Sequence, residues 1–356
     1  MKAWVLHDIG DIRYEDVREP SLSENEVLVQ VKAAGICGSD IPRIYQTGAH
    51  NMPLIPGHEF SGQVVDVSNS ADKVLIGKRV GVFPLIPCRK CKSCLEKRYE
   101  LCTQYSYLGS RRDGGFGEFV SVPEWNLIEL PDEVSYEQAA MLEPMAVAAH
   151  SMRRMSIGKE ANVAVCGLGT IGLLLIMLLL EKGIRNVYAI GTKEAQKMAA
   201  ASLGLPEENY CDCRTDNVTE FIGCKTGNNG VDIFFECVGK NETIVEAVEL
   251  TAAEGQICFV GNPYTDLIME KNVYWKILRN QLTITGTWNS SFWGKQDRNA
   301  TEDDWNYVLS RLKDNRISPD KLVTHKFTPA ELNHGFEIMH NKSEDYIKIE
   351  MTVNPY

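Results

Sequence analysis

Hydrophobic and polar residues alternate in the first part of the chain. In the segment EVLVQVKA, at residues 26–33, Val27, Val29 and Val31 share one face of an extended chain, which is typical of a strand with one buried face. Glycine and proline separate this segment from others like it. The pattern predicts mostly β-structure up to about residue 140.

From about residue 149 the pattern changes to short apolar runs that alternate with longer helical segments. The predicted strands are NVAVCG at 162–167, NVYAIG at 186–191, VDIFFECVG at 231–239 and GQICFVG at 255–261. Helices are predicted between them. Strands that alternate with helices indicate βαβ units, so this region is predicted to form a doubly wound parallel sheet.

One apolar segment of this region allows a second interpretation. Residues 161–180, ANVAVCGLGTIGLLLIMLLL, are apolar enough for a membrane span of about 20 residues. Three glycines divide the segment, however, and this favours a buried strand, a tight turn and a buried helix.

The regular alternation ends after LTITGTW at residues 282–288, and a last strand is predicted in YIKIEMTV at 346–353. We infer that the tail returns to the first domain, which gives boundaries at 1–148, 149–286 and 287–356. A chain of 356 residues is long enough for two domains, because single cores stop growing at roughly 250 to 300 residues.

Composition and charge narrow the class of protein. The formal net charge of -11 disfavours binding to nucleic acid or to an anionic membrane surface, because such partners need a basic face. The N-terminal residues contain no apolar stretch of signal-peptide length, which predicts a cytoplasmic protein. In that setting the 11 cysteines indicate reduced thiols and metal ligands rather than disulfides.

Four of these cysteines form a compact motif. PCRKCKSCLEKRYELC supplies Cys88, Cys91, Cys94 and Cys102 with the spacing C-x2-C-x2-C-x7-C. Four thiolates at this spacing can surround one structural zinc ion and leave no open coordination position. An iron–sulfur cluster also uses four thiolates, but its bacterial form has a shorter last interval followed by proline.

A second group of candidate metal ligands is spread along the chain. GICGSD at 35–40 carries Cys37, PGHEF at 56–60 carries His58 and Glu59, and MLEPMAV at 141–147 carries Glu143. A thiolate, an imidazole and a carboxylate are suitable zinc ligands, and three protein ligands leave a fourth position for water or substrate. This pattern predicts a catalytic zinc.

A glycine motif follows the first strand of the βαβ region. GLGTIG contains Gly167, Gly169 and Gly172 with Thr170 and Ile171 between the last two. The glycines permit a tight turn, close approach of a pyrophosphate and close helix packing, so the motif predicts dinucleotide binding.

An acidic residue is absent where dinucleotide-binding folds usually place one, at the end of the second strand. Gly191 occupies that position and is followed by Thr192 and Lys193. A carboxylate there would bind a ribose 2'-hydroxyl and repel a 2'-phosphate. Its absence favours NADP(H) over NAD(H), with Tyr210 of the next strand beside the phosphate. Glu194 follows directly and is an argument against this preference.

In this order the motifs resemble those of the zinc-dependent medium-chain alcohol and polyol dehydrogenases, and the likeness extends over the whole chain, with most similarity to enzymes of polyol phosphates. The resemblance implies a GroES-like β-barrel catalytic domain, a Rossmann cofactor domain and a homodimer or homotetramer. It implies two zinc ions per subunit. Cys37, His58 and Glu143 would bind the catalytic ion, with Glu59 as a neighbouring group or an alternate ligand.

The same resemblance implies roles for further residues. Asp40 would orient His58, and Ser39 would pass on the proton of the alcohol. Cys237 and Val238 would lie along the path of the nicotinamide. His50 could end the proton relay or be an ordinary surface residue.

For the substrate, the residues leave alternatives open. Arg111 and Arg112 could together bind a phosphate, or they could be a solvated pair beside Asp113; Arg43 is a further candidate. We expect a polyol or polyol phosphate as the small-molecule partner. The other possibilities are an unphosphorylated polyol, butanediol or threonine dehydrogenase that uses NAD, a non-catalytic protein that binds nucleotide and zinc, and a zinc-ribbon nucleic-acid binder.

Overall fold

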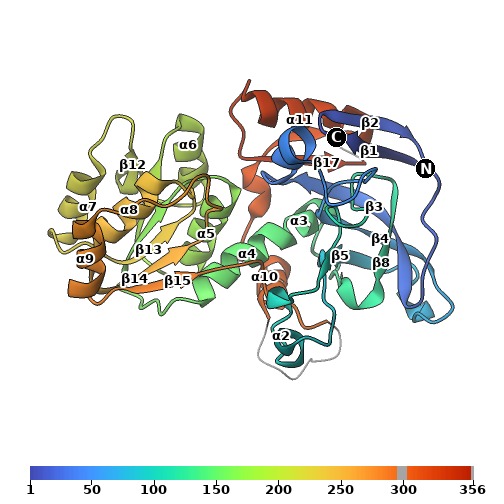
Figure 1. The fold of residues 1–356 in the computed structure, drawn as a ribbon, viewed down its shortest axis with the longest axis horizontal. Helices are drawn as coiled ribbons and strands as arrows, with labels where there is room; N and C mark the ends of the chain where they lie inside the picture. The colour runs from blue at the N-terminus through green and yellow to red at the C-terminus, as the bar shows by residue number, and fades with distance from the viewer. Residues whose placement is uncertain (295–302, 354–356) are drawn as a thin grey trace. The chain divides into compact units, whose positions relative to one another are not determined.

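The computed structural model describes residues 1–294 and 303–353. The chain divides into two compact units, one made of residues 1–146 and 290–356 and the other of residues 147–289 (Figure 1). We call them the first and the second unit. The predicted boundaries, after residues 148 and 286, lie close to these divisions.

The first unit is built on a seven-stranded sheet that takes strands from both ends of the chain. The strand order is β16-β17-β3-β4-β5-β9, and β8 also pairs with β3. The strands of this sheet are β3 (Glu26–Ile36), β4 (Glu59–Val67), β5 (Arg79–Val82), β8 (Phe119–Pro123), β9 (Leu127–Glu129), β16 (Val323–Phe327) and β17 (Lys348–Thr352). Two smaller sheets pair β1 (Lys2–Asp8) with β2 (Asp11–Asp16) and β6 (Leu85–Ile86) with β7 (Ser106–Tyr107).

The C-terminal segment completes this sheet. β17 runs antiparallel to β3, with Ile349 opposite Ile36 (Figure 1). Val27, Val29 and Val31 of β3 are buried, as the alternating pattern predicts. The helices of the first unit are α1 (Asp40–Pro42), α2 (Lys92–Leu95), α3 (Tyr136–Ala140), α10 (Asp304–Lys313) and α11 (Leu332–Asn341), while α4 (Leu142–Arg153) leads into the second unit.

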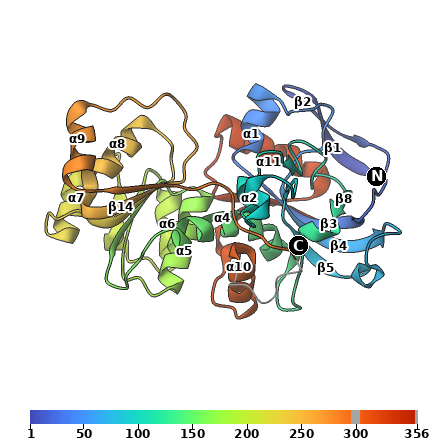
Figure 2. The same ribbon diagram turned by 60° about the horizontal axis from the view of Figure 1, so that its bottom comes forward.

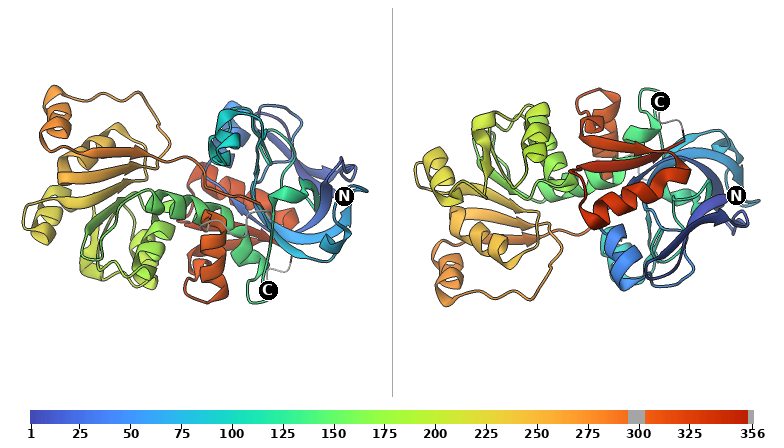
Figure 3. Two further views of the ribbon diagram at one scale, coloured as in Figure 1. Left: turned by 90° about the horizontal axis from the view of Figure 1, so that it is seen from below. Right: turned by 90° about the horizontal axis from the view of Figure 1, so that it is seen from above.

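The second unit has a six-stranded parallel sheet in the order β12-β11-β10-β13-β14-β15. Its strands are β10 (Asn162–Cys166), β11 (Asn186–Gly191), β12 (Tyr210–Asp212), β13 (Val231–Glu236), β14 (Thr251–Phe259) and β15 (Thr283–Gly286). Its helices are α5 (Thr170–Glu181), α6 (Glu194–Ser202), α7 (Val218–Thr226), α8 (Asn241–Leu250) and α9 (Lys271–Arg279). Within this unit, α5 and α6 cover one face of the sheet and α8 and α9 the other (Figures 2 and 3).

This architecture agrees with the predicted fold class, a β-domain completed by the C-terminal segment together with a doubly wound parallel domain. The apolar segment at 161–180 forms β10, a turn and all but the last residue of α5. Across the described ranges, no helix is long and apolar enough to cross a membrane. The strand order places the carboxyl ends of β10, β11 and β12 at one edge of the sheet, which is where the nucleotide motifs lie.

Candidate metal and nucleotide sites

The first candidate site lies where β3 ends and β4 begins. Cys37 directly follows β3, and His58 directly precedes Glu59, the first residue of β4. Gly35 is the antiparallel partner of Glu59, so the two strand ends are neighbours. The ligand atoms of Cys37, His58 and Glu59 all lie within 4.8 Å of one another. A thiolate, an imidazole and a carboxylate in this arrangement fit one zinc ion.

Glu59 is held by a buried lysine that the sequence analysis missed. The ammonium of Lys348, in β17, forms an ion pair with Oε2 of Glu59 and donates to the carbonyl of Ile36 at 3.1 Å. Lys348 is only 2% exposed. A side chain at Gly35 would place its Cβ 2.4 Å from Oε2 of Glu59, so glycine makes room for the pair. The signal in the sequence was a lone lysine between isoleucines in an apolar strand.

Asp40 organises the turn that carries Cys37. Its carboxylate accepts a hydrogen bond from the Cys37 N–H at 3.0 Å and lies 2.6 Å from the Arg43 guanidinium and 3.4 Å from Nδ1 of His58. Asp40 is fully buried, and burial raises the pKa of its carboxyl. The nearby His58 and Arg43 outweigh this effect, so the pKa of Asp40 is lower than its usual value. Burial alone would lower the pKa of His58, but Asp40 and Cys37 raise it well above its usual value. This geometry agrees with the orienting role expected of Asp40.

Glu143 is the third zinc ligand expected from the sequence. Its carboxylate is not among the ligand atoms of Cys37, His58 and Glu59 that lie within 4.8 Å of one another. It lies in the first turn of α4, and its Oε1 accepts a hydrogen bond from the Tyr107 hydroxyl at 3.2 Å. Burial raises the pKa of Glu143 to about 7. The described ligand atoms therefore favour Glu59, the alternate ligand of the sequence analysis, and ligation by Glu143 stays a prediction.

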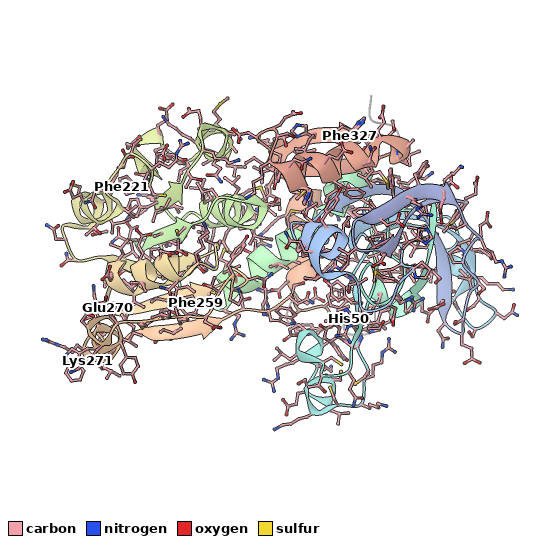
Figure 4. All side chains as sticks on the ribbon, turned by 45° about the horizontal axis from the view of Figure 1, so that its top comes forward. His50, Phe221, Phe259, Glu270, Lys271 and Phe327 are labelled. Atoms are coloured by element: carbon pink, nitrogen blue, oxygen red, sulfur yellow. The ribbon has the colours of Figure 1, made fainter. Side chains whose placement is uncertain are left out.

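Ser39 and His50 belong to the loop region between β3 and β4. Ser39 is half-buried in the turn between Cys37 and Asp40, beside the candidate metal ligand. His50 is exposed (Figure 4). The proton-transfer role of Ser39 and the relay role of His50 stay predictions.

The four cysteines of the PCRKCKSCLEKRYELC motif converge as predicted. Their sulfur atoms all lie within 4.8 Å of one another, with Cys88 4.0 Å from Cys94 and Cys91 3.9 Å from Cys102. Zn–S bonds of about 2.3 Å in a tetrahedron separate sulfur atoms by about 3.8 Å. Backbone hydrogen bonds lower the pKa of Cys91 to about 6, while burial raises the pKa of Cys94 to about 12. The spacing fits one tetrahedral ion.

The glycine turn between β10 and α5 has the geometry of a phosphate-binding loop. Gly167 has a φ of +94°, and its Cβ would lie 2.5 Å from Val238 and 3.0 Å from the carbonyl carbon of Cys237. A Cβ at Gly172 would lie 2.1 Å from the carbonyl oxygen of Gly167. At Gly169, by contrast, no atom of the described chain lies within 4 Å of the Cβ position. Gly169 thus leaves space for an approaching phosphate at the N-terminus of α5.

The space that a side chain at position 191 would occupy is filled by Tyr210 and Gln196. A Cβ there would lie 2.8 Å from the Tyr210 hydroxyl and 2.9 Å from Oε1 of Gln196. The Gln196 oxygen accepts a hydrogen bond from the Thr192 N–H, and the Tyr210 hydroxyl donates to the carbonyl of Lys193. Packing therefore explains the glycine independently of any cofactor, and a phosphate would have to bind beside these groups rather than in the place of the absent acid.

Just beyond β12 lies a further cation that the sequence analysis missed. The Cys213 N–H donates to the carbonyl of Gly191 at 3.0 Å, which places this loop beside the turn after β11. The Arg214 guanidinium donates to both carboxylate oxygens of Asp212, at 2.9 and 2.6 Å. The Asp212 carboxylate, opposite Gly191 in the sheet, compensates the charge of Arg214, so the pair adds no net charge at this end of the sheet.

The two arginines expected to bind phosphate together have separate partners. Arg112 pairs with Glu26 at 2.8 Å and donates to Oγ of Ser121 at 3.0 Å, so it joins β3 to β8. The Arg111 guanidinium carbon instead lies 4.4 Å from the centre of the Tyr105 ring. The predicted chelating pair is thus divided, because Arg112 is used within the fold.

Known families match both parts of the chain. Residues 23–132 match the family described as alcohol dehydrogenase GroES-like domain. Residues 170–312 match the family described as zinc-binding dehydrogenase. The first match contains the Cys37–His58–Glu59 group and the four-cysteine loop, and the second begins at Thr170, the first residue of α5 after the glycine turn.

Individual relatives cover nearly the whole chain. The chain is 32% identical over 330 residues to galactitol 1-phosphate 5-dehydrogenase of Escherichia coli strain K12, covering 92% of both proteins. It is 33% identical over 368 residues to (R,R)-butanediol dehydrogenase of Bacillus subtilis strain 168, covering 99% of this chain and all of the relative. The crystal structure of galactitol-1-phosphate dehydrogenase from Escherichia coli is similar with a TM-score of 0.89 at 30% identity, over 99% of this chain and 100% of that one.

Proposed function

The chain belongs to the zinc-dependent medium-chain alcohol and polyol dehydrogenases, and on this premise we propose that it transfers hydride between NADP(H) and a sugar alcohol phosphate or the corresponding keto-sugar phosphate. The observation that carries the proposal is the convergence of Cys37, His58 and Glu59 within 4.8 Å. Three protein ligands leave one coordination position for a substrate hydroxyl.

The proposed chemistry assigns distinct tasks to the groups around this position. When bound, zinc supplies a Lewis acid that makes the alcohol hydroxyl more acidic, and the nicotinamide supplies the hydride acceptor. Ser39 would pass the hydroxyl proton on towards solvent, giving up its own proton as it accepts that of the alcohol. Asp40 holds His58 in orientation, at 3.4 Å from its Nδ1, and Lys348 holds Glu59. A second zinc in the four-cysteine loop would be structural, because all four of its ligands come from the protein.

NADP(H) is proposed over NAD(H) because the end of β11 carries no acid. A ribose 2'-hydroxyl is normally gripped by Asp or Glu at the position of Gly191. Lys193 supplies positive charge nearby, and Thr192 and Tyr210 supply hydroxyl groups, while the charge of Arg214 is compensated by Asp212. A charge-assisted contact to the 2'-phosphate is worth roughly 1.5 to 3 kcal/mol, which is a tenfold or larger preference.

The substrate proposal is supported by the likeness to galactitol 1-phosphate 5-dehydrogenase and by Arg111, whose guanidinium is outside the Arg112–Glu26 pair. A second candidate is an unphosphorylated polyol or butanediol oxidised with NAD. The likeness to (R,R)-butanediol dehydrogenase and the engagement of Arg112 favour it.

One panel of rate measurements tests cofactor and substrate together. We expect kcat/KM to be about tenfold or more higher with NADP⁺ than with NAD⁺, and higher for hexitol phosphates than for the same hexitols without phosphate. Initial rates should be measured for galactitol, sorbitol, their phosphates and 2,3-butanediol, each with both cofactors. A clear preference for NAD⁺, or faster oxidation of the plain diols, would replace the proposal by the second candidate.

We also propose that the protein forms a homodimer or homotetramer through the second unit. β15 is an edge strand of the six-stranded sheet as described, and open strand edges are pairing surfaces. Large apolar side chains are exposed on β15, on α9, which begins after Glu270 (Figure 4), and on the loop before it. These residues are Leu267, Ile268, Tyr274, Trp275, Leu278 and Ile284. A second copy paired along β15 would cover them.

Sedimentation velocity of the purified chain tests this assembly. We expect a species of at least twice 39.9 kDa, and we expect Ile284→Lys to shift it towards the monomer because a buried lysine would lack a partner. Val74→Lys, at an exposed valine of the first unit, is the matched control and should leave the mass unchanged. A monomeric wild-type chain, or an I284K variant that assembles normally, would rule out this interface.

A cytoplasmic location is proposed as well. None of the eleven cysteines, all of which lie in the described ranges, is in a disulfide, and a reducing compartment favours this state. Recovery of the protein outside the cytoplasmic fraction of the cell would contradict it.

A further inference from the structure

We propose that Glu236 is a positioning residue for the nicotinamide half of the cofactor: its carboxylate holds the backbone that follows β13, over which this half would lie. The inference rests on the proposed nicotinamide-dependent function. It gives a role to a buried acid for which the sequence analysis found none.

The order of the strands determines where each half of a dinucleotide would bind. The chain passes from β10 to β11 and β12 on one side of the sheet and then crosses to β13 and β14 on the other (Figure 1). The strand order therefore reverses between β10 and β13, and dinucleotides bind outside the carboxyl ends of the strands at such a point. With the pyrophosphate at the glycine turn and the adenosine ribose beside Gly191, the nicotinamide half would lie over the ends of β13 and β14.

Glu236, the last residue of β13, connects the two segments at these strand ends. Its carbonyl accepts the N–H of Val260 at 2.8 Å and the N–H of Gly261 at 3.0 Å. A Cβ at Gly239 would lie 1.9 Å from the carbonyl oxygen of Asn262. The segment after β13 therefore packs directly on the segment after β14, and Glu236 is bonded to both.

The side chain of Glu236 fixes the first of these segments. Its Oε1 accepts hydrogen bonds from the N–H groups of Val238 and Gly239 and from the hydroxyl of Thr243 in α8, each at 2.8 Å. Oε2 has no partner within the described ranges, so the hydrogen bonds of this carboxylate all go to the segment or to the helix after it. Glu236 is fully buried, and hydrogen bonds to a carboxylate are roughly twice as strong as those between neutral groups.

The segment held by Glu236 lies against the glycine turn. A Cβ at Gly167 would lie 2.5 Å from Val238. The Cys237 N–H donates to the carbonyl of Cys166, the last residue of β10, at 2.8 Å. A shift of this segment would therefore move the nicotinamide half relative to the pyrophosphate. The turn is also held from the β11 side, where the Gly167 N–H donates to the Ile190 carbonyl at 3.0 Å, so the adenosine half would keep its place.

The test compares whole and half cofactors in calorimetric titrations of the wild type and Glu236→Gln. Adenosine 2',5'-bisphosphate lacks the nicotinamide half of NADPH, and AMP lacks that of NADH, so the two pairs cover either cofactor preference. In E236Q we expect the dissociation constant of the reduced cofactor to rise roughly tenfold, because charge-assisted hydrogen bonds become neutral ones. We expect the dissociation constant of the matching half cofactor to stay unchanged.

The control variants separate positioning from folding. Thr243→Val removes one of the three donors to Oε1 and keeps the carboxylate, so we expect the same selective loss at a smaller size. In the double variant the two losses should not add, because both weaken one group of hydrogen bonds. Glu249→Gln, at an exposed acid of α8, is the matched control for the lost charge and should leave both constants unchanged. Chemical denaturation of each variant reports folding separately.

The possible outcomes are distinct. Equal weakening of the whole and the half cofactor in E236Q would overturn the inference, because Glu236 would then support the second unit as a whole, and no change in either would also overturn it. If E236Q does not fold, the same comparison in T243V decides. A wild type that binds the half cofactor as tightly as the whole one would contradict a held nicotinamide half. If the wild type binds neither reduced cofactor, the proposed function itself fails, and the inference fails with it.

Discussion

Replacing Cys37 by serine is expected to abolish turnover and to remove one of the two zinc ions that we propose for each chain. Cys37 supplies the only thiolate in the described Cys37–His58–Glu59 group, and a neutral serine hydroxyl is a far weaker ligand for zinc. Loss of a Lewis acid worth several kcal/mol corresponds to a decrease in kcat/KM of roughly 10³-fold or more. Initial rates and metal content by mass spectrometry would be measured on the same samples.

The matched control for this prediction is Cys224→Ser. Cys224 is an exposed cysteine outside both candidate metal sites, so the same chemical change there should leave the rate and both zinc ions in place. The prediction would be wrong if C37S kept two zinc ions and more than a tenth of the wild-type rate. Full zinc content with no activity would instead show that the thiolate acts in turnover without being needed to hold the ion.

The four-cysteine site and the glycine turn could be predicted because the residues of each are close in sequence. The four cysteines lie between residues 88 and 102, and the three glycines between 167 and 172, so local spacing alone determines which groups can meet. The structure brings the four sulfur atoms together and gives the glycine turn the expected close contacts. Local motifs of this kind carry their geometry with them.

The side chains that hold the two glutamates of the metal site could not be predicted, because they come from distant segments of the chain. Lys348 is 289 residues from Glu59 and reaches it only because β17 pairs with β3. Tyr107 is 36 residues from Glu143. Sequence spacing contains neither contact, so it leaves the third ligand open between Glu59 and Glu143.

For the arginine pair and the absent acid, the residues are close in sequence, but the structure changes the interpretation of the local pattern. Adjacent charges in a sequence suggest a shared ligand, but Arg112 turns to Glu26 in a neighbouring strand while Arg111 lies against Tyr105. Gly191 suggested an empty space, but Tyr210 and Gln196 fill it. In each case, contacts with residues of other elements determine how the local residues are used.

Replacing Cys94 by serine is expected to destabilise the first unit by about 4 kcal/mol or more, because loss of a structural metal is among the largest single-residue effects and metal binding contributes directly to folding. Cys94 is 4% exposed and lies in α2 within the four-cysteine group. The loop around it carries several charged residues and few apolar ones, so it has little else to order it. Zinc content and chemical denaturation would be measured together.

Cys258→Ser is the control for this change, since Cys258 is fully buried in β14 and is outside both metal groups. It should retain both zinc ions and lose only the small free energy of placing a hydroxyl in an apolar core. Because the four-cysteine site leaves no coordination position for substrate, C94S should keep the Cys37-bound zinc and part of its turnover at temperatures where it stays folded. Equal destabilisation of C94S and C258S would show that the loop is held by its own packing, and one zinc ion in both C258S and the wild type would show that the four thiolates do not bind a structural ion.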